Sequence, residues 1–178
     1  QLTTTFTHLY RDDNPSFTPQ DTIGLVATSN NTVAGGKADL TVRNVVPKIE
    51  SLLLDQMEID EGDTVQLEAM FSDRSPQDRF DVEILWGDGT VTNLSKAAGD
   101  YSISQTHLYR DDHPSSGTPQ DTLKIKLTIA DDDTGVTEKT INLIVNNVAP
   151  EFTSLKLDKT EIDEGDTVTL SGTFKDPG

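Results

Sequence analysis

The chain carries two stretches of its own sequence twice, and this repetition constrains the fold more than any other feature. Residues 58–65 (EIDEGDTV) return unchanged at 161–168, which is 103 residues later. Residues 7–13 (THLYRDD) return at 106–112, which is 99 residues later. Sequence that recurs at a nearly constant period indicates tandem units. A period near 100 residues is the size of a small domain, so we expect each unit to fold around its own core.

The repeats divide the 178 residues into one complete unit between two partial ones. Residues 1–48 correspond to the C-terminal part of a unit, residues 49–149 form the complete unit, and residues 150–178 begin the next one. The sequence starts with Gln in the middle of a unit. We therefore expect it to be a piece of a longer repeat protein.

The pattern of apolar residues predicts β-strands and no helix. Strict alternation of apolar and polar residues places one face of a strand on a core. Such alternation runs through two stretches of the complete unit, and its apolar members are Val65, Leu67, Ala69, Phe71, Phe80, Val82, Ile84 and Trp86. In the first partial unit, strands are expected at 3–10, 23–27 and 38–46. About seven short strands per unit, separated by turns, favour an all-β fold of immunoglobulin-like antiparallel β-sandwich repeats in tandem.

Acidic residues dominate the charge of the chain. Asp and Glu number 31 against 14 Lys and Arg, so the net charge is −17. This charge repels nucleic-acid phosphates, and we expect no nucleic-acid partner.

No apolar run approaches about 18 residues, so we expect no membrane insertion. Clustered carboxylates suit Ca²⁺, although simple solubility would also explain the charge. The chain has no Cys, so disulfides do not hold it together, and bound Ca²⁺ could stabilise a small domain instead.

Three motifs follow one another in the complete unit: WGDGT at 86–90, HLY at 107–109 and LTIADDDTG at 127–135. Their order resembles the PKD (polycystic kidney disease) domain, which typically shows W-G-D-G, then H-x-Y, then L-T-V-x-D-x-x-G. The acidic Glu-Gly-Asp turn and the NNVAP linker at 146–150 resemble the long bacterial subtype of large secreted repeat proteins. Two departures stand out. The loop at 110–121 is longer than the usual family turn, and the first unit has Thr-Ser-Asn at 28–30 in place of the Asp triplet.

The resemblance implies an immunoglobulin-like sandwich that serves as a spacer or binding module, extracellular or on the cell surface. Several family members bind Ca²⁺ through the start of the domain, an Asp in an early loop and the acidic turn after the Leu-Thr-Val strand. Strands that run up and down a sandwich would place the loop 72–78 and the turn 131–135 where the chain enters the unit. The turns 60–63 and 87–89 would lie where it leaves. The expected Ca²⁺ ligands at these junctions are Asp73, Asp131, Asp132 and Asp133, followed by Glu61, Asp63, Asn146 and Asp176.

Other polar residues have simpler explanations. Asp88 is accounted for by a Gly-Asp-Gly hairpin turn, and Glu61 and Asp63 could equally belong to a polar hairpin around Gly62. Trp86 is expected in the core, and His107 is expected to be buried with a satisfied hydrogen bond. No nucleophile and base pair appears, so we expect no enzymatic activity.

The function that these observations favour is a structural extracellular repeat module, within a Ca²⁺-stiffened stalk, an adhesin or a self-assembling surface fibre. Its partners would be neighbouring repeats of the same chain or other copies of itself. In a fibre, one partial unit could complete another by strand addition. The alternative is an accessory module of a secreted protein that binds a carbohydrate or protein ligand. That function would need an exposed aromatic platform, and only 6% of the residues are aromatic.

Overall fold

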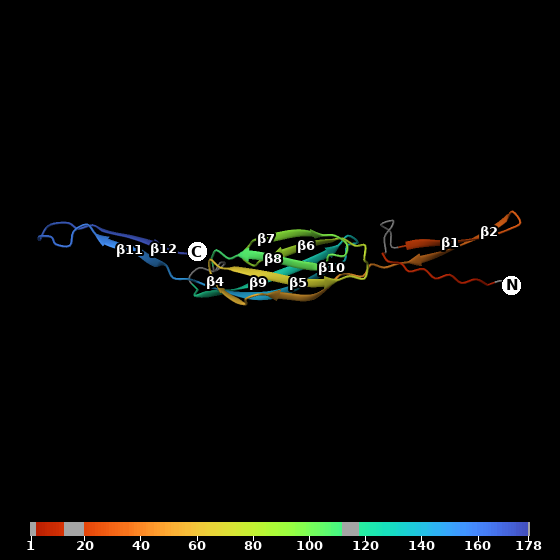
Figure 1. Cartoon of the computed structure of the whole chain (residues 1–178), viewed down its shortest axis with the longest axis horizontal. Coiled ribbons are helices and arrows are strands. Elements are labelled where there is room, and N and C mark those ends of the chain that lie inside the picture. Colours follow the sequence, from red (N-terminus) through yellow and green to blue (C-terminus); the bar gives the residue numbers. More distant parts are fainter. Residues whose placement is uncertain (1–2, 13–19, 112–117, 178) are drawn as a thin grey trace.

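The structure is a computed structural model of the chain, and it describes residues 3–12, 20–111 and 118–177. Over these ranges the protein is all-β, with strands and no helix. Figure 1 shows an elongated molecule in which the sheets of the complete unit lie between two separate hairpins. The described residues include no helix long and apolar enough to cross a membrane. We call the place where residues 1–48 meet the complete unit the first junction, and the place where it meets residues 150–178 the second junction.

The larger sheet of the complete unit has five strands in the spatial order β4-β10-β9-β6-β7. Neighbouring strands are antiparallel, except that β4 pairs with β10 in parallel. The strands are β4 (Glu58–Asp60), β6 (Phe80–Leu85), β7 (Val91–Lys96), β9 (Gln120–Asp131) and β10 (Val136–Asn146). Because β6 and β9 are antiparallel neighbours, the start of β6 lies beside the end of β9, at the first junction.

The smaller sheet has three antiparallel strands in the order β3-β5-β8. They are β3 (Lys48–Leu54), β5 (Thr64–Ser72) and β8 (Ser102–Leu108). Apolar residues of both sheets join in one buried cluster that includes Leu67 and Phe71 from β5 and Ile125 and Ile129 from β9. The cluster is therefore the core of the complete unit. Each fully buried side chain of this kind contributes roughly 1.5–3 kcal/mol.

The alternation predicted for the complete unit is confirmed. All eight apolar positions between Val65 and Trp86 that the pattern assigned to the core are at most 3% exposed. The turn at Gly87 also packs tightly, because a Cβ there would approach the backbone of Lys124 to 3.1 Å, and its φ of 92° favours glycine. The sequence alternates here because each strand has one face on the core and one face toward solvent.

The two end hairpins repeat local structure of the complete unit without its core. The first consists of β1 (Gln20–Ser29) and β2 (Thr32–Thr41), and the second of β11 (Glu151–Leu157) and β12 (Leu170–Lys175). In the second hairpin Phe152 pairs with Phe174, as Ile49 pairs with Phe71 in the complete unit, and both ladders shift register directly after that pair. Phe174 is nevertheless 66% exposed, whereas its counterpart Phe71 is 3% exposed. The repeated sequence therefore specifies the hairpin, whereas burial requires the rest of a unit.

Two expectations for the first partial unit were wrong. The expected strand at 3–10 is absent, since residues 3–11 have no regular structure. Their counterpart in the complete unit, β8, is a strand because it pairs with β5, and no described residue offers that partner to residues 3–11. The last strand of this unit, expected at 38–46, is β2 and ends at Thr41. The loop expected at 110–121 lies partly outside the described residues.

Candidate metal centre

Two groups of three aspartates converge at the first junction. In the first group, which we call the inner triad, Asp73 follows β5, Asp78 precedes β6 and Asp131 ends β9. In the second group, the outer triad, Asp78 meets Asp12 and Asp133. Within each triad, one carboxylate oxygen from every residue lies within 4.8 Å of the others. The antiparallel pairing of β6 with β9 brings the loop 73–79 and the turn 131–135 together.

The acidic turn after β9 is held by its own first residue. The Oδ1 of Asp131 accepts hydrogen bonds from the backbone N–H groups of Asp133, at 3.1 Å, and Gly135, at 2.5 Å. Thr134 adopts a positive φ of 75°, which is unusual for a β-branched residue. This turn directs Asp131 into the inner triad and Asp133 into the outer one.

Asp132 has a different role from its two neighbours. Its Oδ1 accepts the backbone N–H of Arg79 at 3.1 Å, and its own N–H donates to the Arg79 carbonyl at 3.1 Å. These two bonds hold the loop 73–79 against the acidic turn. Asp132, which the sequence suggested as a ligand, therefore positions the two loops and lies outside both triads.

Asp78 is the most unusual residue of the centre. It is 2% exposed, and neither of its carboxylate oxygens has a hydrogen-bond partner among the described residues. Burial raises the pKa of Asp78 from 3.8 to about 6, and the charges of Asp73 and Asp12 add to the rise. The Ser75 hydroxyl lies near enough to oppose this rise in part, without the geometry of a hydrogen bond. A buried carboxylate without a partner is costly, and a bound cation would relieve that cost.

The pKa of Asp73 is also raised by burial. Bonds from the backbone N–H groups of Ser75 and Arg74 oppose this rise in pKa, and the charge of Asp131 adds to it. Its Oδ1 accepts the N–H of Ser75 at 2.9 Å, but its Oδ2 is buried without a partner. No basic side chain among the described residues forms an ion pair with any member of the inner triad.

Residues of the first partial unit reach this centre. The side-chain amide of Asn44 donates to Oδ2 of Asp131 at 2.8 Å. A cleft of about 390 Å³ separates the two units, and its lining includes Asp12 and Asn44 on one side and Asp73 and Arg74 on the other. The centre therefore lies between repeats.

We expect Gly135→Ala to destabilise the complete unit by about 1–3 kcal/mol, because overpacking displaces neighbouring groups. A Cβ at Gly135 would collide with Oδ2 of Asp131 and would lie 2.8 Å from Nδ2 of Asn44. Urea unfolding followed by Trp86 fluorescence measures the change. Gly36→Ala is the matched control, since a Cβ there meets nothing within 4 Å. Equal effects of the two substitutions would contradict this close approach.

The remaining sequence-predicted ligands lie near the second junction, where Glu61, Asp63 and Asn146 make hydrogen bonds. Glu61 is 4% exposed, and its Oε1 accepts the backbone N–H of Val148 in the linker at 2.9 Å. The side-chain amide of Asn146 donates to carboxylates of β4, and Asp63 accepts a long bond of 3.4 Å from the N–H of Asp60. Asp176 borders the linker beside Val148. Among the described residues, no three carboxylates converge at this junction closely enough to form a further triad.

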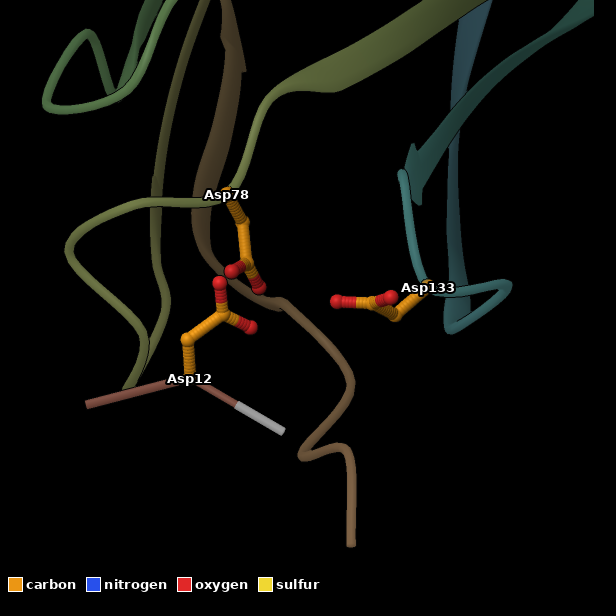
Figure 2. Close-up of side chains that lie close together, drawn as sticks. All are labelled: Asp12, Asp78 and Asp133. Carbon is orange, nitrogen blue, oxygen red and sulfur yellow. The ribbon is translucent and has the colours of Figure 1, made fainter. Parts of the chain in front are cut away.

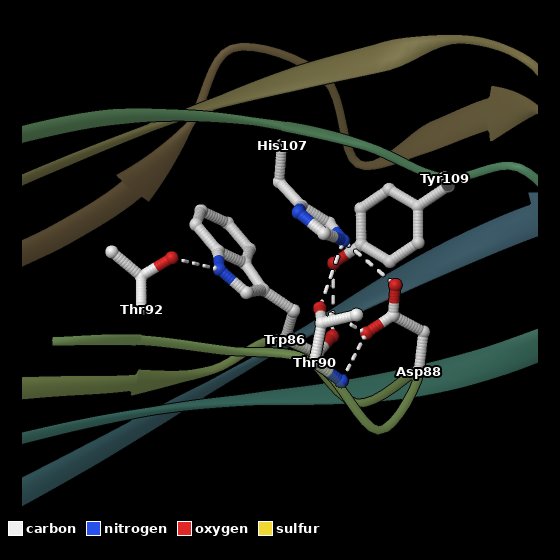
Figure 3. A network of polar contacts seen from close by, with 6 residues as sticks. All are labelled: Trp86, Asp88, Thr90, Thr92, His107 and Tyr109. Atoms are coloured by element: carbon white, nitrogen blue, oxygen red, sulfur yellow. Dashed lines mark hydrogen bonds and ion pairs between the residues drawn. The ribbon is translucent and has the colours of Figure 1, made fainter.

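A separate polar cluster surrounds Asp88 (Figure 3). One carboxylate oxygen of Asp88 accepts bonds from the N–H of Thr90, at 2.9 Å, and from its hydroxyl, at 2.6 Å, and the other lies 2.7 Å from Nε2 of His107. The His107 ring stacks on Trp86 at 4.6 Å. Burial alone would raise the pKa of Asp88, but the bonds from Thr90 and His107 outweigh it and lower the pKa. Asp88 is thus satisfied by protein groups, as expected for a turn residue.

Sequence reasoning missed Asp12 and Asp78. Asp78 stands at the end of the loop 72–78, two positions before Phe80, the first residue of β6. Pairing β6 with β9 would have placed it beside the acidic turn. Asp12 belongs to the repeated THLYRDD sequence, but its approach to the next unit is a long-range contact that no local pattern encodes.

The residues present fit Ca²⁺. The donors are all oxygens, which a hard cation requires, and Ca²⁺ takes six to eight of them. The partnerless buried oxygens of Asp78 and Asp73 are positions that a cation would satisfy. Asp73, Asp78 and Asp131 would hold the ion, which would neutralise their mutual repulsion.

Comparisons with known proteins give little further guidance. No protein-family model matches the chain, and no curated protein matches it. Among solved structures, the chain is similar to the Pseudomonas fluorescens alkylpurine DNA glycosylase AlkC bound to DNA containing an abasic site analog, with 14% sequence identity and a TM-score of 0.36. The match covers 56% of this chain and 30% of that chain. The function is therefore inferred from the chain's own residues and geometry.

Proposed function

We propose that this chain is a structural repeat module in which Ca²⁺ bound at the junction between repeats stiffens an extended array. The observation that carries the proposal is Asp78, a buried carboxylate without a hydrogen-bond partner at the place where one repeat meets the next. An ion at this place would bind only the folded protein and would therefore stabilise it.

The proposal includes an immunoglobulin-like sandwich of the PKD type for the complete unit. Its two sheets contribute to one core, as sheets packed face to face would. Two motifs of the resemblance also lie together: the WGDG turn meets His107 and Tyr109, whose hydroxyl donates to the Trp86 carbonyl at 2.9 Å. These contacts give the first two motifs a common structural reason.

We place the module outside the cell or on its surface, in a stalk, an adhesin or a self-assembling fibre. Extracellular modules use Ca²⁺ sites of modest affinity, for which dissociation constants are about 10⁻⁴–10⁻³ M. The chain has no Cys, so a disulfide cannot take the stabilising role that we assign to Ca²⁺. The module has no catalytic role in this proposal.

The partners we propose are neighbouring repeats or other copies of the chain. Leu155 and Leu170 of the second hairpin are 62% and 61% exposed, whereas their counterparts Leu52 and Leu67 are 6% and 0% exposed. Apolar positions that a complete unit buries require cover in the assembled protein. Phe152 and Phe174 are also exposed, but their counterparts in the complete unit, Ile49 and Phe71, pack in or against the core. A complete unit would therefore bury these two rings, so they do not favour an aromatic platform that binds a carbohydrate.

Small-angle X-ray scattering tests the stiffening. With millimolar Ca²⁺ we expect one extended arrangement of the units, and with EDTA a smaller radius of gyration because the first junction bends. Circular dichroism in both conditions verifies that the strands persist. An identical scattering profile with and without Ca²⁺ would contradict the proposed function.

A further inference from the structure

We propose that the first junction holds two Ca²⁺ ions that share Asp78, and that the second ion ties the repeats together through Asp12. This inference rests on the proposed function and extends it by assigning a separate site to the outer triad. Figure 2 shows the carboxylates of Asp12, Asp78 and Asp133 turned toward one another. The three come from separate segments: the first partial unit, the loop before β6 and the turn after β9.

The shared residue can serve two ions because both of its oxygens are available. Oδ1 and Oδ2 of Asp78 are buried, and neither has a hydrogen-bond partner among the described residues. Asp78 belongs to both triads, and in each its oxygen lies within 4.8 Å of the other two carboxylates. A carboxylate that bridges two cations uses one oxygen for each. Oδ1 and Oδ2 of Asp78 could therefore each contact one ion.

The charge at the junction also favours two ions. Asp12, Asp73, Asp78, Asp131 and Asp133 together carry a formal charge of −5 when ionised. One Ca²⁺ would reduce this charge to −3, and a second would reduce it to −1. Because carboxylates at such separations repel one another strongly, one ion would leave most of the repulsion in place.

The two sites have different structural roles. The inner triad draws all its carboxylates from the complete unit, and the preceding unit reaches it only through the Asn44 amide that donates to Oδ2 of Asp131. The outer triad includes Asp12 of the preceding unit, so only its ion would be bound by carboxylates of both repeats. The acidic turn presents both sites at a fixed spacing, because Oδ1 of Asp131 accepts the N–H of Asp133 at 3.1 Å. The counterpart of Asp12 in the complete unit is Asp111, which is exposed and belongs to neither triad.

Isothermal titration calorimetry of the EDTA-stripped 178-residue chain with CaCl₂ tests the proposal. We expect two ions at this junction in the wild-type chain, one in Asp12→Asn, one in Asp133→Asn and none in Asp78→Asn. Asp111→Asn is the matched control, because it removes the same charge from the corresponding position and should bind as many ions as the wild type.

A distance measurement distinguishes an ion that connects the two repeats from an ion that binds without connecting them. The chain has no Cys, so spin labels can be placed at Thr32→Cys and Thr140→Cys on either side of the junction. Ca²⁺ should narrow the distribution of label distances in the wild type but not in Asp12→Asn, even though that variant still binds one ion.

The outcomes are distinguishable. If no Ca²⁺ binds to the wild type, the proposed function fails and this inference fails with it. If Ca²⁺ binds but Asp12→Asn loses no ion relative to Asp111→Asn, or if its label distances narrow as in the wild type, the second site is refuted and the proposed function stands. The loss of one ion together with the loss of narrowing supports the shared second site.

Discussion

Asp78→Asn is expected to stabilise the metal-free protein and to abolish its stabilisation by Ca²⁺. The neutral amide removes a buried charge that lacks a partner, and leaving such a group unsatisfied costs about 1–3 kcal/mol. At hundreds of times the dissociation constant, which for sites of the proposed affinity means about 0.1 M Ca²⁺, the wild type should gain about 3–4 kcal/mol, and the variant should gain none of it. The two proteins should therefore exchange order of stability between EDTA and Ca²⁺ in urea unfolding experiments.

The pH dependence provides a control for this effect. An ordinary Asp ionises near 3.8, whereas folded Asp78 ionises near 6, so between these values the folded state holds a proton that the unfolded state has lost. The metal-free wild type should lose stability as pH rises from about 4 to about 6 relative to the variant. Asp81→Asn, an exposed residue that accepts a bond from Ser95, should change neither the pH slope nor the response to Ca²⁺. An unaltered response to Ca²⁺ in Asp78→Asn would refute its role.

Trp86→Ala is expected to have the largest effect on the core, a loss of about 3–5 kcal/mol. Trp86 is 1% exposed and is among the largest fully buried side chains of the described residues. Its removal leaves a cavity, strips the stacking partner from His107 and leaves the Thr92 hydroxyl without the indole donor. Urea unfolding followed by circular dichroism measures the loss.

Leu53→Ala provides the comparison, because Leu53 is also apolar and lies on β3 but is 59% exposed. Its effect should be within about 0.5 kcal/mol. A loss below about 1 kcal/mol for Trp86→Ala would show that the indole does not organise the core, and the structural reason given for the WGDG motif would then be wrong.

The core of the complete unit could be read from the sequence because alternation is a local property. Each of Val65, Phe71 and Ile84 carries the signal of its own burial in its neighbours along the strand. The strand expected at 3–10 had the right composition but lacked a pairing partner, and composition does not report a partner. Strand formation depends on the neighbouring strand as much as on propensity.

The site could be predicted only in part for a similar reason. Asp73 and Asp131 could be predicted as ligands because they lie at the ends of strands whose direction follows from an up-and-down fold. Asp78 and Asp12 were not, because their importance lies in burial and in a contact across the junction. Glu61 shows the opposite difficulty, since a carboxylate suited to a metal also accepts a backbone N–H, here that of Val148.

The most direct test of the central claim is the thermal unfolding midpoint of the 178-residue chain in millimolar Ca²⁺ and in EDTA. Ca²⁺ binding at Asp73, Asp78 and Asp131 predicts a clearly higher midpoint in Ca²⁺, since the ion binds the folded state alone. The same midpoint in both solutions would contradict the claim and would mean that the rigidity of this acidic array comes from direct packing between repeats.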